Sequence, residues 1–405
     1  SWDVSTTDGA IAIDEDSATD LAAITTTGNL SVVSAGSVTD SGVVSVGGTT
    51  GVTVATTEDV ILDSANTFTG AMTLTAGGGG GGTAFGDVTI KNSTAVKWDT
   101  NADEAGDLYL NAGTDGAVGG DLSIISGGAI TQGIELGVTG SASFKTLNNT
   151  PAGITLSNAS NTFGAITAQA RNAADGSDVA GSITIREGAA MAIADISTTG
   201  TLSLTTTGAL TQSGAIDAGA VTVSASGQDV TLTNTSNAMT SVNITGANID
   251  VTDSNGIDIA AISSATTLDV IAGDAITDSG TITVSGAATF KTKKDAAAAI
   301  TLNNANVHTF GSVKAETRNA DDDATVAGAI TIDENAAMDI AGLTTASTVS
   351  LTADGAITDS GAIAAGAITI DTTGGGSTAA RAVTIAGQTT NATSWDVSTT
   401  DGAIA

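Results

Sequence analysis

Short apolar-x-apolar triplets recur along this chain at a regular interval. Val230, Ile249 and Leu268 begin successive triplets at a 19-residue step (249 − 230 = 19 and 268 − 249 = 19), and Leu202 and Val221 repeat it. The middle residue of each triplet is polar, so the aliphatic side chains fall on one face of a β-strand. Short strands at a fixed step, separated by Gly, Asn and Asp and with almost no helix signals, predict an all-β fold. The specific prediction is a parallel β-solenoid with about 19 residues per coil.

The coils are grouped into five degenerate repeat units. The first marker of a unit is an apolar-x-apolar strand followed by Asn-rich residues and usually an aromatic residue. It begins at Val60, Ile154, Val230, Ile300 and Val383. A second marker, Thr-(Asp/Gln)-Ser-Gly, precedes each of these strands, at Thr39, Thr211, Thr277 and Thr358 and in the shortened form Thr131-Gln132-Gly133. Two independent markers that each occur once per unit indicate internal repetition.

A longer repeat encloses these units. Residues 1–12 recur as residues 394–405, an offset of 394 − 1 = 393 residues. This predicts that residues 1–405 are one continuous solenoid segment of a tandem array with a 393-residue period. A period would hold about 21 coils and measure on the order of 100 Å. We therefore expect an elongated rod in which Ile11 and Ile404 occupy equivalent inward positions.

The composition agrees with a narrow interior. The chain is 41% hydrophobic but only 2% aromatic, so Ala, Val, Ile and Leu must fill the core. A sandwich or barrel is the alternative, but it needs closed domains with hairpin turns and gives no reason for a continuous 19-residue step. The chain has no Cys, and stability must therefore come from stacking rather than from disulfides.

The formal net charge of −32 limits the partners. Such a surface repels nucleic acid and anionic membranes and attracts divalent cations or basic partners. No apolar run approaches the ~20 residues of a membrane span. We expect no nucleic-acid partner and no membrane span.

Acidic clusters are the strongest candidates for ligand binding. Asp175 and Asp178 follow Arg171-Asn-Ala, and Asp321, Asp322 and Asp323 follow Arg318-Asn-Ala, which predicts one recurring loop. Calcium prefers several carboxylate and carbonyl oxygens that converge from a turn. We therefore name these five aspartates as a candidate calcium site, with a solvated turn as the alternative, and we expect no other cofactor.

No catalytic residue is predicted. The sole histidine, His308, lies in an Asn-rich turn, and no Ser stands in a nucleophile motif. Arg171 and Arg318, close to their aspartates, imitate the Asp–Arg chemistry of some polysaccharide lyases, but a group copied once per unit favours a structural role. The tract Gly77–Gly82 lacks the following helix of a phosphate loop and is interpreted as a turn.

Other repeated residues are interpreted as corner elements. Phe68, Phe163 and Phe310 are expected to cover the coil at one corner. The Asn residues before them are expected to form turns or hydrogen-bonded ladders between coils: Asn158, Asn161, Asn234, Asn237, Asn303, Asn304 and Asn306.

Two segments resemble the repeats of filamentous haemagglutinin-type bacterial exoproteins and other giant repetitive adhesins. One is Gly-Ala-Ile-Thr-Asp-Ser-Gly at residues 355–361, with a shorter copy at 275–280, and the other is residues 243–255. The resemblance implies a right-handed β-helix that is secreted to the bacterial cell surface.

Taken together, these features predict a non-enzymatic structural protein. We expect a stiff acidic rod within a secreted surface fibre or adhesin stalk, whose partners are neighbouring copies of the repeat, joined covalently or stacked end to end, and other rods laterally. The main alternative is an adhesin that binds extracellular glycans or cells through its exposed faces. A polysaccharide lyase and an ice-binding solenoid are the remaining alternatives.

Overall fold

A computed structural model describes residues 1–77, 84–99, 103–111, 117–304, 308–373, 381–386, 390–399 and 402–404. The chain divides into two compact bodies, Ser1–Gly208 and Ala209–Ala405, here called the N-terminal and C-terminal bodies. Strands and turns make up all the regular structure in the described part of both bodies. No helix there is long and apolar enough to cross a membrane.

The N-terminal body contains the strands β1 (Trp2–Thr6), β2 (Ile11–Glu15), β3 (Thr19–Thr26), β4 (Leu30–Ser34), β5 (Val38–Asp40), β6 (Val44–Val46), β7 (Thr50–Val54), β8 (Val60–Phe68), β9 (Met72–Ala76), β10 (Val88–Asn92), β11 (Val96–Trp98), β12 (Asp107–Asn111), β13 (Ala117–Val118), β14 (Leu122–Ser126), β15 (Ile130–Gln132), β16 (Gly137–Leu147), β17 (Ile154–Leu156), β18 (Thr162–Arg171), β19 (Ile183–Glu187), β20 (Met191–Ser197) and β21 (Leu202–Thr206).

The C-terminal body contains the strands β22 (Leu210–Gln212), β23 (Ile216–Ser224), β24 (Val230–Leu232), β25 (Ala238–Asp253), β26 (Ile257–Ala272), β27 (Ile276–Asp278), β28 (Ile282–Lys293), β29 (Ile300–Leu302), β30 (Thr309–Arg318), β31 (Ile330–Glu334), β32 (Met338–Thr344), β33 (Val349–Ala353), β34 (Ile357–Asp359), β35 (Ile363–Asp371), β36 (Val383–Thr384) and β37 (Thr390–Ser398).

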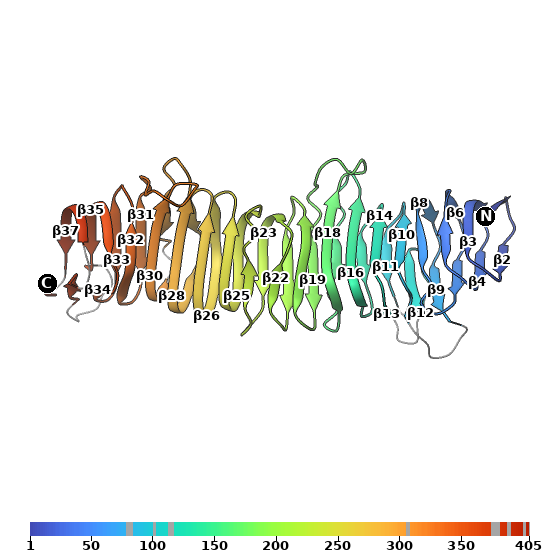
Figure 1. Ribbon diagram of the computed structural model, residues 1–405, viewed down its shortest axis with the longest axis horizontal. Coiled ribbons are helices and arrows are strands. Elements are labelled where there is room, and N and C mark those ends of the chain that lie inside the picture. Colours follow the sequence, from blue (N-terminus) through green and yellow to red (C-terminus); the bar gives the residue numbers. More distant parts are fainter. Residues whose placement is uncertain are drawn as a thin grey trace. The chain divides into compact units, whose positions relative to one another are not determined.

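Within each body the paired strands run parallel, and they lie side by side in Figure 1. Residues with the same role in successive coils form columns at the strand spacing of ~4.8 Å. One column from each body is Val88–Leu122–Ala142–Ile166 and Ile300–Ile330–Val349–Ile368. Parallel partners cannot be joined by a hairpin, so the chain completes a coil before it returns to the column. The prediction of an all-β parallel solenoid is confirmed.

The regular coil has the expected length of about 19 residues. Partners in register keep the 19-residue step in both bodies, as Ile183–Leu202 (202 − 183 = 19) and Ile330–Val349 (349 − 330 = 19) show. Other coils are longer, since Ile154 pairs with Ile183 (183 − 154 = 29) and Ile300 pairs with Ile330 (330 − 300 = 30). Their extra residues form loops after β18 and β30, which extend past the neighbouring strand ends in Figure 1. Insertions are therefore placed outside the stack and leave the columns in register.

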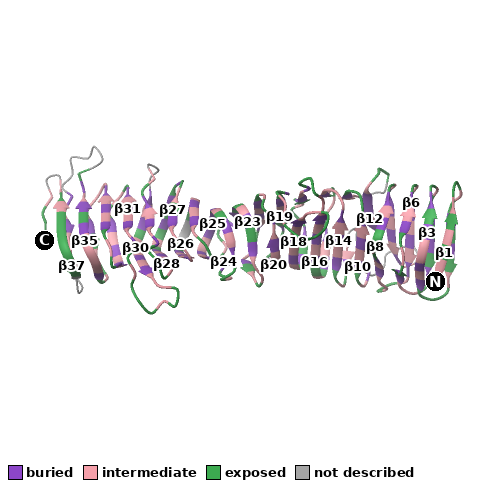
Figure 2. Cartoon of the chain, turned by 90° about the horizontal axis from the view of Figure 1, so that it is seen from above, coloured by how far each residue is buried: buried purple, intermediate pink, exposed green. Residues whose placement is uncertain are grey.

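The core lies between the strands of each coil and consists mainly of small aliphatic side chains. Burial alternates along the strands, as the banding in Figure 2 shows. The corner aromatics are buried as predicted: Phe68, Phe163 and Phe310 are 1%, 7% and 6% exposed. Phe163 packs edge-to-face on Phe144 of the preceding coil, with ring centroids 6.0 Å apart, and Phe310 packs on Phe290 in the same way at 5.9 Å.

The expectation that Ile11 and Ile404 occupy equivalent inward positions is wrong. Ile11 is 7% exposed, whereas Ile404 is 61% exposed. Ile11 belongs to β2 and is covered by Leu30 of β4. Ile404 forms a single parallel bridge with Val383, and no strand in the described part of the chain covers its other side. The continuity of residues 1–405 as one tandem segment stays a prediction.

The glycine of the Thr-(Asp/Gln)-Ser-Gly marker is required by close contact between coils. A Cβ on Gly42, Gly280 or Gly361 would lie 1.4, 1.7 or 1.8 Å from the carbonyl oxygen of Ala22, Ala260 or Ala341, respectively. These carbonyls belong to the backbone of the preceding coil and cannot move aside without disturbing its strand pairing.

We predict that Gly280→Ala lowers the free energy of unfolding by about 3 kcal/mol, because the new methyl group forces two coils apart. Urea denaturation measures the change. Gly176→Ala is the matched control, because a Cβ there meets no atom within 4 Å, and it should change stability by less than about 0.5 kcal/mol. Equal effects of the two substitutions would contradict the close-contact explanation.

Candidate functional site

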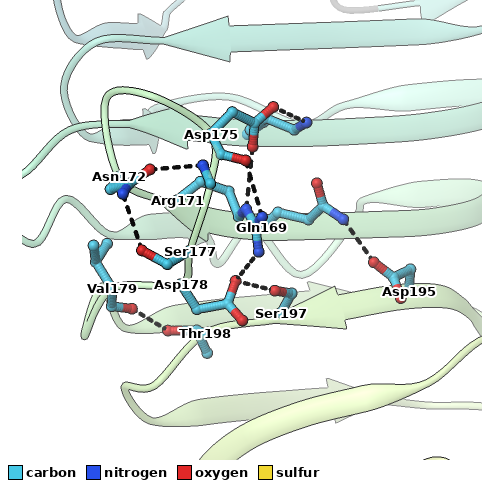
Figure 3. A network of polar contacts seen from close by, with 12 residues as sticks. Gln169, Arg171, Asn172, Asp175, Ser177, Asp178, Val179, Asp195, Ser197 and Thr198 are labelled. Atoms are coloured by element: carbon cyan, nitrogen blue, oxygen red, sulfur yellow. Dashed lines mark hydrogen bonds and ion pairs between the residues drawn. The ribbon is translucent and has the colours of Figure 1, made fainter.

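The predicted acidic loops are built around ion pairs. After β18, the Arg171 side chain turns back onto the loop, where its Nε lies 3.1 Å from Oδ1 of Asp175 and its Nη1 pairs with Asp178 at 2.5 Å (Figure 3). Lys145 of β16 reaches the other oxygen of Asp175 at 2.9 Å. Burial alone would raise the pKa of Asp175, but the hydrogen bonds and charges of Lys145 and Arg171 lower it below its usual value.

Asn172 closes the same loop. Its backbone N–H donates to the carbonyl of Ser177 at 2.9 Å, and its Oδ1 accepts from Gly176 N–H at 2.8 Å. Arg171 and Asp178 form an antiparallel bridge at the base of the loop. Asp175 adopts a left-handed conformation with φ of 55°, which the surrounding bonds stabilise.

A second copy of this loop follows β30, with Arg318 in the place of Arg171. Arg318 Nε and Lys291 Nζ contact the two oxygens of Asp322 at 3.1 and 3.0 Å, and Asp322 also has a positive φ, of 61°. Thr325 occupies the place of Asp178 and accepts from Arg318 Nη1 at 3.2 Å. The prediction of one recurring loop is confirmed by these matching contacts.

The predicted calcium ligands lie in two copies of one loop, one copy in each body, and most of them are engaged in other bonds. Asp175, Asp178 and Asp322 are paired with cations, Asp323 accepts from Asn319 Nδ2 at 2.7 Å, and Asp321 is exposed. Among the residues that the structure describes, no group of three or more His, Cys, Asp or Glu could hold a metal ion. Calcium binding stays a prediction, and the ion would have to displace Arg or Lys from these carboxylates.

Sequence analysis missed the direct contact between the two repeat markers. The Asp or Gln of the second marker reaches the Asn-rich turn of the first marker in the next coil. That residue is the first rung of a largely buried array that we call the polar spine, which has three rungs in each of four repeats. Its members are Asp40–Asn66–Asn92, Gln132–Asn161–Glu187, Gln212–Asn237–Asp253 and Asp278–His308–Glu334.

The first rung caps the turn of the following coil. Gln132 Oε1 accepts from the backbone N–H of Asn158 at 3.0 Å, and Gln212 does the same for Asn234 at 3.3 Å. Asp40, Asp278 and Asp359 accept from Asp63, Asn303 and Ala386 at 2.8, 2.9 and 2.9 Å. The two markers therefore lie one coil apart, and turn residues lengthen the interval in some units.

The second rung accepts a buried backbone N–H from the preceding coil. Asn161 Oδ1 accepts from Leu136 at 2.9 Å, and its Nδ2 donates to the Arg186 carbonyl of the following coil at 3.0 Å. The same acceptor bond joins Val44 to Asn66, Ile216 to Asn237 and Ile282 to His308, at 2.8, 2.9 and 3.1 Å. Asn161 thus links three coils.

The third rung accepts the N–H of the corner residue itself. The bonds are Phe68 to Asn92 at 3.0 Å, Phe163 to Glu187 at 2.8 Å, Met239 to Asp253 at 2.6 Å and Phe310 to Glu334 at 2.9 Å. Each of these acceptors is at most 5% exposed. A buried N–H left without an acceptor is costly, so the spine satisfies the backbone where the chain turns.

His308 occupies a second-rung position. Its Nδ1 accepts from Ile282, which leaves the proton on Nε2, and Nε2 lies 2.9 Å from Oδ2 of Asp278. Both side chains are at most 1% exposed. The only histidine of the chain therefore takes the place that Asn fills in the other repeats. Asn306 and Gly78–Gly82, also considered from the sequence, lie outside the described residues.

The comparison with known families fits this periodicity. A family model described as repeats of unknown function (DUF5649) matches residues 8–75, 86–170, 180–245 and 246–315. The chain belongs to this family. Each matched DUF5649 repeat contains one first rung and one second rung of the polar spine. No curated protein and no solved structure matches the chain.

Two third-rung carboxyls of these repeats have altered acidity. Burial raises the pKa of Glu187 and of Glu334 from the usual 4.5 to about 7, although the N–H groups of Phe163 and Phe310 lower it. The Oε2 atom of each has no hydrogen-bond partner in the described part of the structure. These groups therefore stay protonated up to a higher pH in the folded chain than an ordinary glutamate does.

We predict that Asn237→Ala lowers the free energy of unfolding by about 3 kcal/mol, because it leaves the buried Ile216 N–H and Gln212 without their partner. Denaturation in urea measures the loss. The neighbouring exposed Ser236 supplies the control, since Ser236→Ala keeps the backbone N–H that donates to Asn234 and should leave stability within about 0.5 kcal/mol. Equal free energies of unfolding for the two variants would show that the spine does not stabilise the fold.

We also predict that the two buried glutamates make stability fall between pH 4.5 and 7. Their folded pKa is raised, so their ionisation costs nothing below the unfolded pKa of 4.5 and its full cost is reached above about 7. Each is expected to contribute about 3 kcal/mol to this fall. Unfolding measured from pH 4 to 8 should show a smaller fall for Glu187→Gln/Glu334→Gln.

The exposed Glu135→Gln is the control for the pH series, and its profile should follow that of the unchanged chain. Profiles that coincide for all three proteins would show that the two carboxyls ionise freely in the folded state.

Proposed function

We propose that this chain is a structural segment of a secreted bacterial repeat protein and acts as a stiff acidic rod in a surface fibre or adhesin stalk. The observation that carries the proposal is the polar spine. In each of four repeats, the most elaborate buried side-chain chemistry joins one coil to the next. Buried contacts that join successive coils are expected in a protein that is selected for its shape.

Three further features support this function. The columns stay in register even where a loop lengthens a coil, as at the pairs Ile154–Ile183 and Ile300–Ile330. Stacked coils supply stability without Cys. The net charge of −32 keeps neighbouring rods soluble and apart unless cations or basic groups join them.

Neighbouring copies of the repeat are the proposed partners. The recurrence of residues 1–12 as 394–405 favours periods joined in one covalent chain. Extracellular localisation is proposed from the likeness of residues 243–255 and 355–361 to the repeats of haemagglutinin-type exoproteins.

Small-angle X-ray scattering tests the rod. We expect a cross-section that stays constant with chain length and a maximum dimension that nearly doubles when two 393-residue periods are joined in one chain, an increase on the order of 100 Å. A maximum dimension that grows much less than this, or scattering typical of a flexible chain, would overturn the proposal.

A further inference from the structure

A pocket of about 310 Å³ lies in the N-terminal body beside the polar spine. Asn66 and Asn92 of the spine form part of its lining, and Ile125 and Leu147 add apolar surface. Ala173, from the loop that Arg171 stabilises, lines it as well. The pocket volume is at the lower end of the range for small-ligand sites.

The charge of this pocket is opposite to that of the chain. The protein has 43 Asp and Glu against 11 Lys and Arg, yet none of the residues that line the pocket is acidic. Lys91 lines it and, within the described residues, forms no ion pair. An unpaired ammonium group in a lining without carboxylates favours an anionic ligand.

A second potential donor, Asn149, also lines the pocket. The neighbouring Asn148 uses both of its polar atoms for bonds within the protein, since its Nδ2 donates to the Gly127 carbonyl at 2.7 Å and its Oδ1 accepts from Thr150 N–H at 2.8 Å. Asn149 Oδ1 accepts from Ala173 N–H at 3.1 Å. This bond leaves the Nδ2 hydrogens of Asn149 available to an acceptor in the pocket.

The turn in the C-terminal body that corresponds to Asn148 and Asn149 makes the same backbone contacts with different side chains. Asn148 and Lys294 correspond, because their N–H groups donate to the carbonyls of Arg171 and Arg318 at 2.9 Å. Asp295 therefore stands in the place of Asn149, and it accepts from Ala320 N–H at the same 3.1 Å.

Thr252 of β25 corresponds to Lys91 of β10, one residue before the third rung in each body. Both bodies therefore contain this part of the lining. The N-terminal copy combines a cation, Lys91, with an amide donor, Asn149, where the C-terminal copy has Thr252 and Asp295.

We propose that this pocket binds a small ligand through a carboxylate, with Lys91 and Asn149 as the donors. Its volume admits a ligand of one or two sugar rings or a short peptide end. The shared chemistry is a carboxylate next to a compact, partly apolar body, which a uronic acid or a peptide C-terminus would supply. This site does not depend on the rod function, because it rests on one pocket of one body.

Calorimetric titration of the full chain with glucuronate and with N-acetyl-Ala-Ala distinguishes the two sources. We expect one of the two acids to bind, and its methyl ester or amide to bind at least tenfold more weakly. Lys91→Thr and Asn149→Asp install the residues of the C-terminal copy and should each lower the affinity at least tenfold. Arg186→Gln removes an exposed cation outside the pocket and should leave the affinity unchanged.

Equal binding of an acid and its uncharged derivative would overturn the proposal, and so would no binding of either acid at millimolar concentration. Full affinity of Lys91→Thr would overturn it too, and thermal melting would show that this variant is folded. The comparison of acid with ester uses the unchanged chain, so it decides the question even if a variant fails to fold. Neither result alters the scattering test of the rod.

Discussion

A backbone N–H that is buried at a corner needs an acceptor, and the rest of this structure depends on how that need is met. In the strands, the carbonyl of the adjacent coil accepts each N–H. Where the chain turns, the columns of carbonyls are interrupted, and donors such as Leu136 and Phe163 face a side chain instead. Because that side chain comes from the next coil, satisfying one coil fixes the position of another. The polar spine is therefore a device for register as well as for stability.

The acceptors of the third rung make the same hydrogen bond to a corner N–H, but they differ in whether their second polar atom also has a partner. Asn92 accepts from Phe68 and uses its Nδ2 to donate to Thr94 at 2.9 Å. Asp253 accepts from Met239 and uses its second oxygen to accept from Asn255 N–H at 2.8 Å. Glu187 makes the same bond to a corner N–H but leaves Oε2 without a partner in the described structure. Burial then acts on a carboxyl with one unpaired oxygen, and it raises the pKa of Glu187 to about 7.

Sequence patterns predict the parts of this fold that depend on one strand at a time. Alternation in triplets such as Ile183-Thr184-Ile185 gives the strand and its inward face, and the 19-residue step gives the parallel coil. Asn161 and Asn237 were expected in turns or ladders between coils, but their bonds to Gln132 and Gln212 were not predicted, because these partners meet only after the chain has completed a coil. The acidic loops were located correctly by the Arg-Asn-Ala motif. Their ion pairs with Lys145 and Lys291 were not predicted, since these cations come from another strand of the stack.

The longer coils of this solenoid contain residues that are not needed for stacking and can therefore take on other roles, such as ligand binding. In a regular 19-residue coil, the inward residues pack in the columns and the turn residues contact the spine. Few side chains of such a coil are therefore left to bind anything else. The loops after β18 and β30 lie outside those constraints, and each is stabilised by Asn, Asp and Arg contacts within the loop and by one lysine of a neighbouring coil. Because most of these bonds lie within the loop, residues next to it can change without disturbing the stack. Asn149 and Asp295 illustrate this freedom, because they make the same backbone contact although one carries a neutral amide and the other a carboxylate.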